Sequence, residues 1–196
     1  MDIKSFFSIL SGIVFLYAFY PYWKAILRGE TKPQKVTWLI WAISDGVILA
    51  GMLANDTING LLVGAVISAT ITFILALKFG KSGWNRQDKV CLTLSILAIL
   101  LWVFSGESNV GIALSLLVIV IGMWPTWVST LENPAHESKK GWAIFLISSF
   151  LAMVAITNRT FADVAPPSVF FTLDLSMVYL LFIHPVFKRI AVNHVK

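Results

Sequence analysis

The sequence predicts an all-α integral membrane protein in which seven transmembrane helices form two parallel three-helix bundles joined by a linker helix. Three observations predict this fold: the composition, a series of apolar runs, and an internal repeat. Of the 196 residues, 58% are hydrophobic and only 13% are charged, and the mean hydropathy is +0.82. Soluble domains carry about a quarter charged residues. This composition excludes an ordinary soluble domain and indicates a protein of the lipid bilayer.

Seven apolar runs follow one another along the chain. They cover residues 6–26, 36–54, 58–77, 90–104, 110–128, 141–156 and 166–186. Most of them reach the length of about 17 to 25 residues that a spanning helix needs. Backbone amides in hydrocarbon must be satisfied within their own segment, so we expect helices rather than open strands. The fourth and sixth runs are short and would have to include flanking polar residues.

The basic residues predict the orientation of these helices. Only Lys4 and Arg159 fall in loops on one side, whereas every other lysine and arginine falls on the opposite side. The positive-inside rule then places the N-terminus outside and the C-terminus in the cytoplasm of a plasma (inner) membrane. The net charge of +5 therefore reflects topology and gives no reason to expect a nucleic-acid partner.

Residues 11–45 recur, altered, at residues 115–149. A shift of 104 positions without a gap superposes Pro21 on Pro125, Trp23 on Trp127 and Trp38 on Trp142. Such a shift spans four helices, so the second copy enters the membrane in the same direction as the first. The predicted domains are a first triple-helix bundle (1–79), a linker helix with its loops (80–109), a second bundle (110–187) and a cytoplasmic tail (188–196).

A proline near the cytoplasmic end of the first helix, a basic turn and an aromatic-rich second helix make up a pattern that resembles the SWEET and PQ-loop transporters. The resemblance covers residues 6–79 and 110–186. Where the family's name motif has Gln after the proline, this chain has Tyr22 and Thr126. The resemblance implies three helices, one linker and three more helices, an outside N-terminus and transport of a small solute.

Two acidic residues, Asp45 and Asp174, lie near the middle of apolar runs. A charged carboxylate at the bilayer centre costs about 2.5 to 3.5 kcal/mol on insertion scales, so we expect both to face a polar interior. Trp38 and Trp41 share one helix face with Asp45 because they lie seven and four residues before it. The shifted equivalents are Trp142, Phe145 and Ser149 for that face, and Thr70 for Asp174.

These positions predict a substrate site between the two bundles. Its residues are Trp38, Trp41, Asp45, Thr70, Trp142, Ser149 and Asp174. Two carboxyl groups in one low-dielectric cavity make protonation part of the cycle, so Asp45 and Asp174 are also the predicted proton-coupling residues. The alternative is that each is a buried structural aspartate satisfied by Ser, Thr or backbone groups.

Other patterns concern packing and motion. Small residues recur at four-residue spacing in the third helix (Gly60, Gly64, Ser68, Thr72) and in the seventh (Ser168, Thr172, Ser176), which favours close helix packing over substrate hydrogen bonding. Pro21 and Pro125 lie at matched positions in the two copies, and we predict that they are hinges; static kinks are the alternative. Pro166 and Pro167 are expected to start the seventh helix and Pro185 to end it. No metal-ligand spacing, catalytic residue or cofactor motif is present.

The function predicted from these features is alternating-access transport of a small polar or cationic solute, coupled to protons through the two aspartates. A facilitative transporter of sugar or another neutral solute, and a non-transporting membrane scaffold or assembly protein, are the alternatives. Paired intramembrane aspartates can hydrolyse peptide bonds, but Asp45 and Asp174 lack the Gly-x-Gly-Asp context of the membrane aspartyl proteases, so no enzyme is expected. The predicted partners are the lipid bilayer and the solute, and a homo-oligomer is compatible with the sequence.

Overall fold

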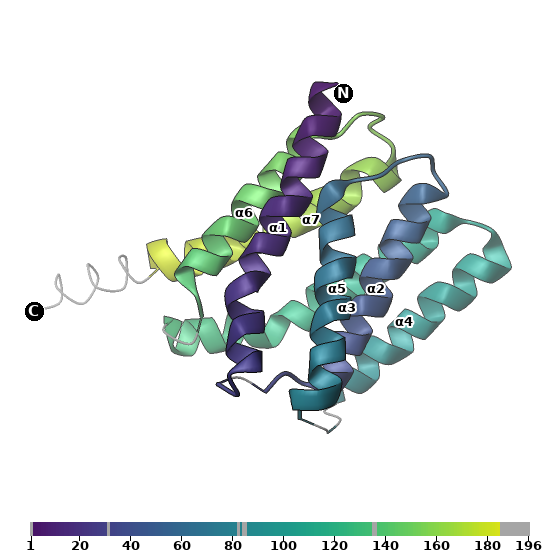
Figure 1. Ribbon diagram of the computed structural model, residues 1–196. Coiled ribbons are helices and arrows are strands. Elements are labelled where there is room, and N and C mark those ends of the chain that lie inside the picture. Colours follow the sequence, from purple (N-terminus) through teal and green to yellow (C-terminus); the bar gives the residue numbers. More distant parts are fainter. Residues whose placement is uncertain (1, 31, 82, 84–85, 135–136, 185–196) are drawn as a thin grey trace, which may run out of the picture.

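A computed structural model describes residues 2–30, 32–81, 83, 86–134 and 137–184. The described chain is helical, with seven α-helices and a final π-helical segment (Figure 1). The helices are α1 (Ile3–Leu27), α2 (Lys35–Leu53), α3 (Gly60–Phe79), α4 (Arg86–Ser105), α5 (Ser108–Glu132), α6 (Lys139–Val154) and α7 (Phe161–Val178), and η2 (Tyr179–Ile183) is the π-helical continuation of α7.

Six of these helices, namely α1 to α5 and α7 with η2, are long and apolar enough to cross a membrane. This indicates a multi-pass membrane protein. The helix α6 is different because its 16 residues span about 24 Å, less than the roughly 30 Å of a hydrocarbon core. The short sixth run of the sequence is therefore a helix, but its length does not by itself make it a seventh membrane span.

Local side-chain caps fix where several helices begin. The Asp2 carboxylate accepts the backbone N–H of Ser5 at 2.7 Å at the start of α1. That bond, together with one from the Ser5 hydroxyl, holds the pKa of Asp2 below its ordinary value. Ser138 caps α6 in the same way by accepting the Gly141 N–H at 3.1 Å. Such caps satisfy amides that have no partner within the helix.

The seventh helix begins earlier than the sequence suggested. The Thr160 side chain accepts the backbone N–H of Asp163, and α7 starts at Phe161. Pro166 and Pro167 lie inside the helix, so their interpretation as the helix start was wrong. The capping threonine supplies a start signal that precedes the prolines, and the missing proline N–H groups are tolerated within the helix. Pro185 lies outside the described residues.

The helices pack in matching pairs in the two parts of the chain. The helix α3 contacts both α1 and α2, and α7 contacts both α5 and α6. Between the two groups, α1 packs on α6 and α2 packs on α5. The helix α4 lies against α5 and α2. Figure 1 shows α4 at the edge of the molecule, beside α2 and α5.

The indole N–H of Trp23 on α1 donates to Thr72 Oγ1 on α3 at 2.9 Å. A second bond of the same kind joins Trp127 on α5 to Ser176 Oγ on α7 at 2.8 Å. Each residue of the second bond lies 104 positions after its counterpart in the first. The repeat found in the sequence is therefore matched by one repeated contact in the structure.

The small-residue stripe of α3 packs closely against α1, as predicted. A Cβ atom on Gly12 would lie 2.5 Å from the carbonyl oxygen of Gly60, and one on Gly60 would meet the backbone of Ser8. The Gly60 N–H also donates a hydrogen bond to Ser8 Oγ at 2.8 Å. Backbones that approach this closely require glycine at the crossing.

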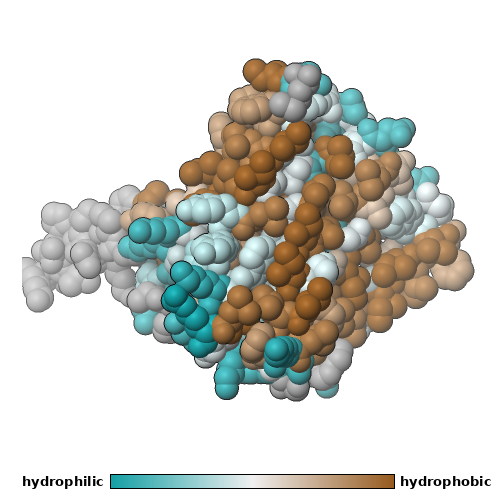
Figure 2. All heavy atoms as spheres, viewed as in Figure 1, coloured by the Kyte–Doolittle hydropathy of each residue, from teal (hydrophilic) through white to brown (hydrophobic). Residues whose placement is uncertain are grey.

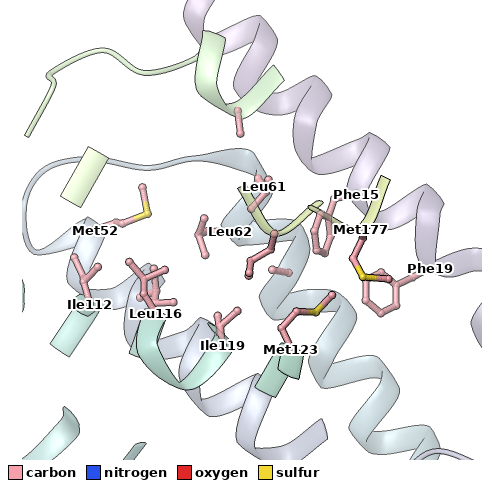
Figure 3. Close-up of a cluster of buried hydrophobic side chains, with 14 of the residues drawn as sticks. Phe15, Phe19, Met52, Leu61, Leu62, Ile112, Leu116, Ile119, Met123 and Met177 are labelled. Carbon is pink, nitrogen blue, oxygen red and sulfur yellow. The ribbon is translucent and has the colours of Figure 1, made fainter. Parts of the chain in front are cut away.

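The core lies where the two groups of helices meet. Figure 3 shows Phe15 and Phe19 of α1, Leu61 and Leu62 of α3, several side chains of α5 and Met177 of α7 gathered in one cluster. The outside is apolar as well, with Val103 72% and Phe104 83% exposed. Figure 2 shows apolar residues covering much of one face. Apolar surface both inside and outside is expected of a protein that lipid surrounds.

Candidate functional site

Asp45 lies in the middle of α2, ten residues from its first residue, or about 15 Å along the helix. Its side chain is 3% exposed, and Oδ1 has no hydrogen-bond partner among the described residues. The neighbouring Ser44 is also buried, and its hydroxyl lies 3.2 Å from Ser95 Oγ on α4. A buried carboxyl oxygen without a partner is costly and calls for a chemical explanation.

Asp174 occupies a comparable position in α7. It is 5% exposed, and its Oδ2 likewise has no partner among the described residues. The Ser149 side chain on α6 lies next to this carboxyl group. The Ser149 hydroxyl also lies 3.2 Å from the Leu146 carbonyl oxygen. Of the predicted site residues, Ser149 and Asp174 are thus brought into direct contact.

The helices that carry the two aspartates touch each other, since α2 contacts α7. No hydrogen bond joins the two carboxyl groups in the described part of the chain. Trp41, one turn before Asp45, packs against α5, where a Cβ atom on Gly122 would lie 3.1 Å from the indole nitrogen. Asp45 therefore lies on the side of α2 that meets α5, whereas Asp174 meets α6 through Ser149.

The predicted tryptophans belong to one network of aromatic rings. Trp38 contacts Phe19 and Trp41, with ring centroids 5.8 Å and 5.6 Å away. Trp142 contacts Phe145 at 5.7 Å, and its indole N–H donates to Glu137 Oε2 at 2.9 Å. Phe19 of α1 joins the two sides because it also packs on Phe145 at 5.3 Å.

Sequence reasoning missed Phe15 and Phe19, which bring the aromatic residues of α2 and α6 together through α1. Both are buried, and both contact Phe145. A signal was present, because Phe15, Phe19 and Trp23 follow one another at four-residue spacing and therefore share one helix face. The same stripe contains Trp23, which is bonded to Thr72.

Thr70, the shifted equivalent of Asp174, is exposed in the structure. Its neighbours Ser68 and Thr72 are the fully buried hydroxyl residues of α3. Thr72 is bonded to Trp23, whereas Ser68 Oγ has no partner in the described residues. Asp174 and its repeat equivalent Thr70 therefore occupy different environments in the two parts of the chain.

A groove of about 560 Å³ opens between α2 and α4. Its lining is apolar and includes Ala42, Gly46 and Ala50 from α2 and Ile99 and Trp102 from α4. Asp45 does not line this groove. The groove therefore offers space for an apolar group and no polar anchor from the predicted site.

The two predicted hinge prolines lie within long helices. Pro21 is an exposed residue inside α1, and Pro125 lies inside α5 with its side chain outside what the structure describes. Both positions continue as helix on either side. Their role as hinges stays a prediction.

Comparisons with known proteins complete these observations. No family model, curated protein or solved structure matches the chain.

Proposed function

We propose that this chain is an alternating-access transporter of a small polar or cationic solute, coupled to protons through Asp45 and Asp174. The observation that carries the proposal is the pair of buried carboxyl groups on α2 and α7, each with one oxygen that has no partner among the described residues. Ionisable groups within membrane-spanning helices are expensive and mark ion or substrate pathways.

The proposed architecture is seven spans built as two parallel bundles, α1–α3 and α5–α7, with α4 as the linker. The matching helix contacts and the two tryptophan bonds support it, because each recurs after 104 residues. In this arrangement α6 crosses a locally thin part of the bilayer or includes its polar flanks. The basic loops favour an N-terminus outside a plasma membrane. The three-one-three order is the one that the SWEET and PQ-loop resemblance implies.

The absence of buried cations beside Asp45 and Asp174, among the described residues, supports proton coupling. Every described lysine and arginine is at least partly exposed, so none of them is buried beside either aspartate. A buried carboxylate without a counter-ion is strongly unfavourable, so we expect both acids to be neutral in this arrangement of the helices. A protonated Asp174 can donate to Ser149, whose own proton then goes to the Leu146 carbonyl. In this chain of donors only Asp174 Oδ2 is left without a partner among the described residues.

The aromatic residues suit the proposed class of solute. Trp38, Trp41 and Trp142 lie toward the same ends of α2 and α6 and are connected through Phe19 and Phe145. Faces of indole rings attract organic cations, and Ser149 adds a hydroxyl group next to Asp174. A cationic solute would replace the proton as the partner of the carboxyl group. The proposed partners remain this solute and the bilayer.

The test is uptake by purified protein in liposomes, with and without an inward proton gradient, over a panel of cationic and neutral solutes. We expect the gradient to accelerate uptake of a cationic or polar solute, and Asp45→Asn and Asp174→Asn to abolish that acceleration. The matched control is Asp56→Asn, the same chemical change at an exposed loop residue. Equal uptake rates with and without the gradient would contradict proton coupling and favour the facilitative transporter of a neutral solute.

The apolar core favours the second candidate, a non-transporting membrane scaffold or assembly protein. Phe15, Ile119, Met123 and Met177 fill the space between the two groups of helices (Figure 3). A scaffold requires such a packed interior, whereas a transporter must open it during the cycle. Absence of uptake for every solute, together with no shift in thermal stability on adding any of them, would support the scaffold.

A further inference from the structure

The end of the molecule that carries the N-terminus is closed by polar bonds between the two groups of helices. Figure 1 shows this end of α1 and the α2–α3 and α6–α7 connections at the upper side of the molecule. We propose that four contacts there form an outer latch, whose release opens the path to the buried aspartates. The latch contacts are Lys4–Val154, Asn59–Ala152, Asn55–Ser108 and Thr57–Asp163.

Two of these contacts supply hydrogen-bond donors from the other group of helices to the last carbonyl groups of α6. The backbone after α6 supplies donors to the carbonyls of Leu151 and Met153, from Ala155 and Ile156. The carbonyls of Ala152 and Val154 receive their donors from the other group of helices instead. Asn59 Nδ2 reaches Ala152 O at 3.1 Å, and Lys4 Nζ reaches Val154 O at 2.6 Å.

This capping between helices has a clear physical basis. The last carbonyls of a helix lack partners within it, and a cation near them interacts favourably with the helix dipole. Asn59 uses both ends of its amide, because Oδ1 accepts the Leu61 N–H at the start of α3 while Nδ2 donates to α6. Separation of α1 and α3 from α6 would leave these carbonyls without their donors.

Each of the other two contacts contains one residue that is the repeat equivalent of a residue in the first two. Lys4 and Ser108 differ by 104 positions, as do Asn59 and Asp163. Ser108 accepts Asn55 Nδ2 at 2.6 Å, and the same amide also donates to Gly51 O at the end of α2. The first residues of α1 and α5 thus each help to hold the end of a helix from the other group.

Asp163 forms the fourth contact and is itself rigidly held. Its Oδ2 accepts the backbone N–H groups of Thr157, Asn158 and Arg159 at 2.8, 2.6 and 3.3 Å. Its Oδ1 accepts the hydroxyl of Thr57, in the α2–α3 connection, at 3.5 Å. The carboxylate is 2% exposed, so it ties the two connections together from a buried position.

Toward the opposite end, the two groups of helices meet through aromatic side chains, with Phe19 packed edge-on against Phe145. Dispersion contacts of this kind can slide, whereas a set of directed hydrogen bonds must break together. The structure is therefore the arrangement closed on the N-terminal side. This inference rests on the proposed function only in giving the opening a role in transport.

The experiment measures access rather than uptake. In a Cys91→Ser background, Met52→Cys reports on the core just below the latch and Met177→Cys on a deeper position; both methionines are 0% exposed. Latch release here means removing the two contacts to the end of α6, by combining Asn59→Asp, which keeps the oxygen that caps α3, with Lys4→Met. A membrane-impermeant thiol reagent is added on the N-terminal side, and the labelling rate is followed for each cysteine.

We expect latch release to accelerate labelling of Met52→Cys about tenfold, since directed bonds to carbonyls are lost. Labelling of Met177→Cys should stay at its slow basal rate, and Lys4→Arg, which keeps a donor, should leave both rates unchanged. The proposal is overturned if Met52→Cys reacts at the same rate with and without the latch, or if both cysteines accelerate equally because the protein unfolds. Lack of uptake combined with latch-dependent labelling would remove the proposed function and leave the latch.

Discussion

Asp174 on α7 and Ser149 on α6 form a buried pair in the middle of the helical assembly. The pair joins two helices of the same group, and it leaves Asp174 Oδ2 without a partner in the described residues. The Ser149 hydroxyl donates to the Leu146 carbonyl oxygen at 3.2 Å, so it can accept a hydrogen bond from a protonated Asp174.

This pair predicts the effect of removing the hydroxyl. Ser149→Ala should lower the free energy of unfolding by about 0.5 to 1.5 kcal/mol, because a buried partner of Asp174 is lost. The matched control is Thr93→Ala, which removes an exposed hydroxyl bonded only to Lys89 O within its own helix. Denaturant unfolding in detergent measures both. An equal loss in the two variants would show that Ser149 has no special partner.

The crossing of α1 and α3 predicts a strong effect of a single methyl group. Gly60→Ala would place a Cβ atom against the Ser8 backbone, so the helices must move apart. We expect the free energy of unfolding to fall by about 1 to 3 kcal/mol, as for other overpacked sites. Thermal unfolding of the purified protein is the measurement.

Gly46→Ala is the matched control for that substitution, because it adds the same methyl group inside α2 where nothing lies within 4 Å. Alanine is the better helix former by about 0.5 to 1 kcal/mol, so Gly46→Ala should leave stability unchanged or raise it. A destabilisation of the same size in both variants would argue against close packing of α1 on α3.

The repeated tryptophan hydrogen bonds predict the same loss of stability for two substitutions. Trp23→Phe and Trp127→Phe each remove an indole N–H and keep an aromatic ring, so each should cost about 0.5 to 1.5 kcal/mol of unfolding free energy. The exposed Trp124 supplies the control, Trp124→Phe, for which we expect little change. Chemical denaturation followed by far-ultraviolet circular dichroism is suitable. A loss at only one of the two repeat positions would mean that the bonds are not equivalent.

Much of the fold could be read from local sequence. Each apolar run became a helix close to its predicted bounds, because a bilayer leaves the backbone few alternatives to a helix. The start of α7 was misplaced because Pro166 and Pro167 are conspicuous, whereas the capping Thr160 is one of many threonines. The stripe of α3 was interpreted correctly because glycine at four-residue spacing has one common use, the close crossing of helices.

The candidate site could be predicted only in part. Asp45 and Asp174 were found because charge is rare in apolar runs, and both are indeed buried. Their surroundings were not predictable, since Thr70 occupies the position equivalent to Asp174 and is nevertheless exposed. The latch was also missed. Asn59 and Lys4 are common residue types near helix ends, and their partners are backbone carbonyl groups of α6 that lie far away in the sequence.

The sequence by itself indicated the membrane character, the approximate helix bounds and the two acids within apolar helices, and it predicts the repeat architecture. These follow from composition, run length and self-similarity, which are properties of the chain read in order. Only the tertiary structure decided that Ser149 lies beside Asp174, that Phe19 joins Trp38 to Phe145, and that one group of helices caps the other. The physical reason is that these contacts depend on how each helix is rotated and crossed against its neighbours. Rotation and crossing are set by packing between segments that are far apart in the sequence.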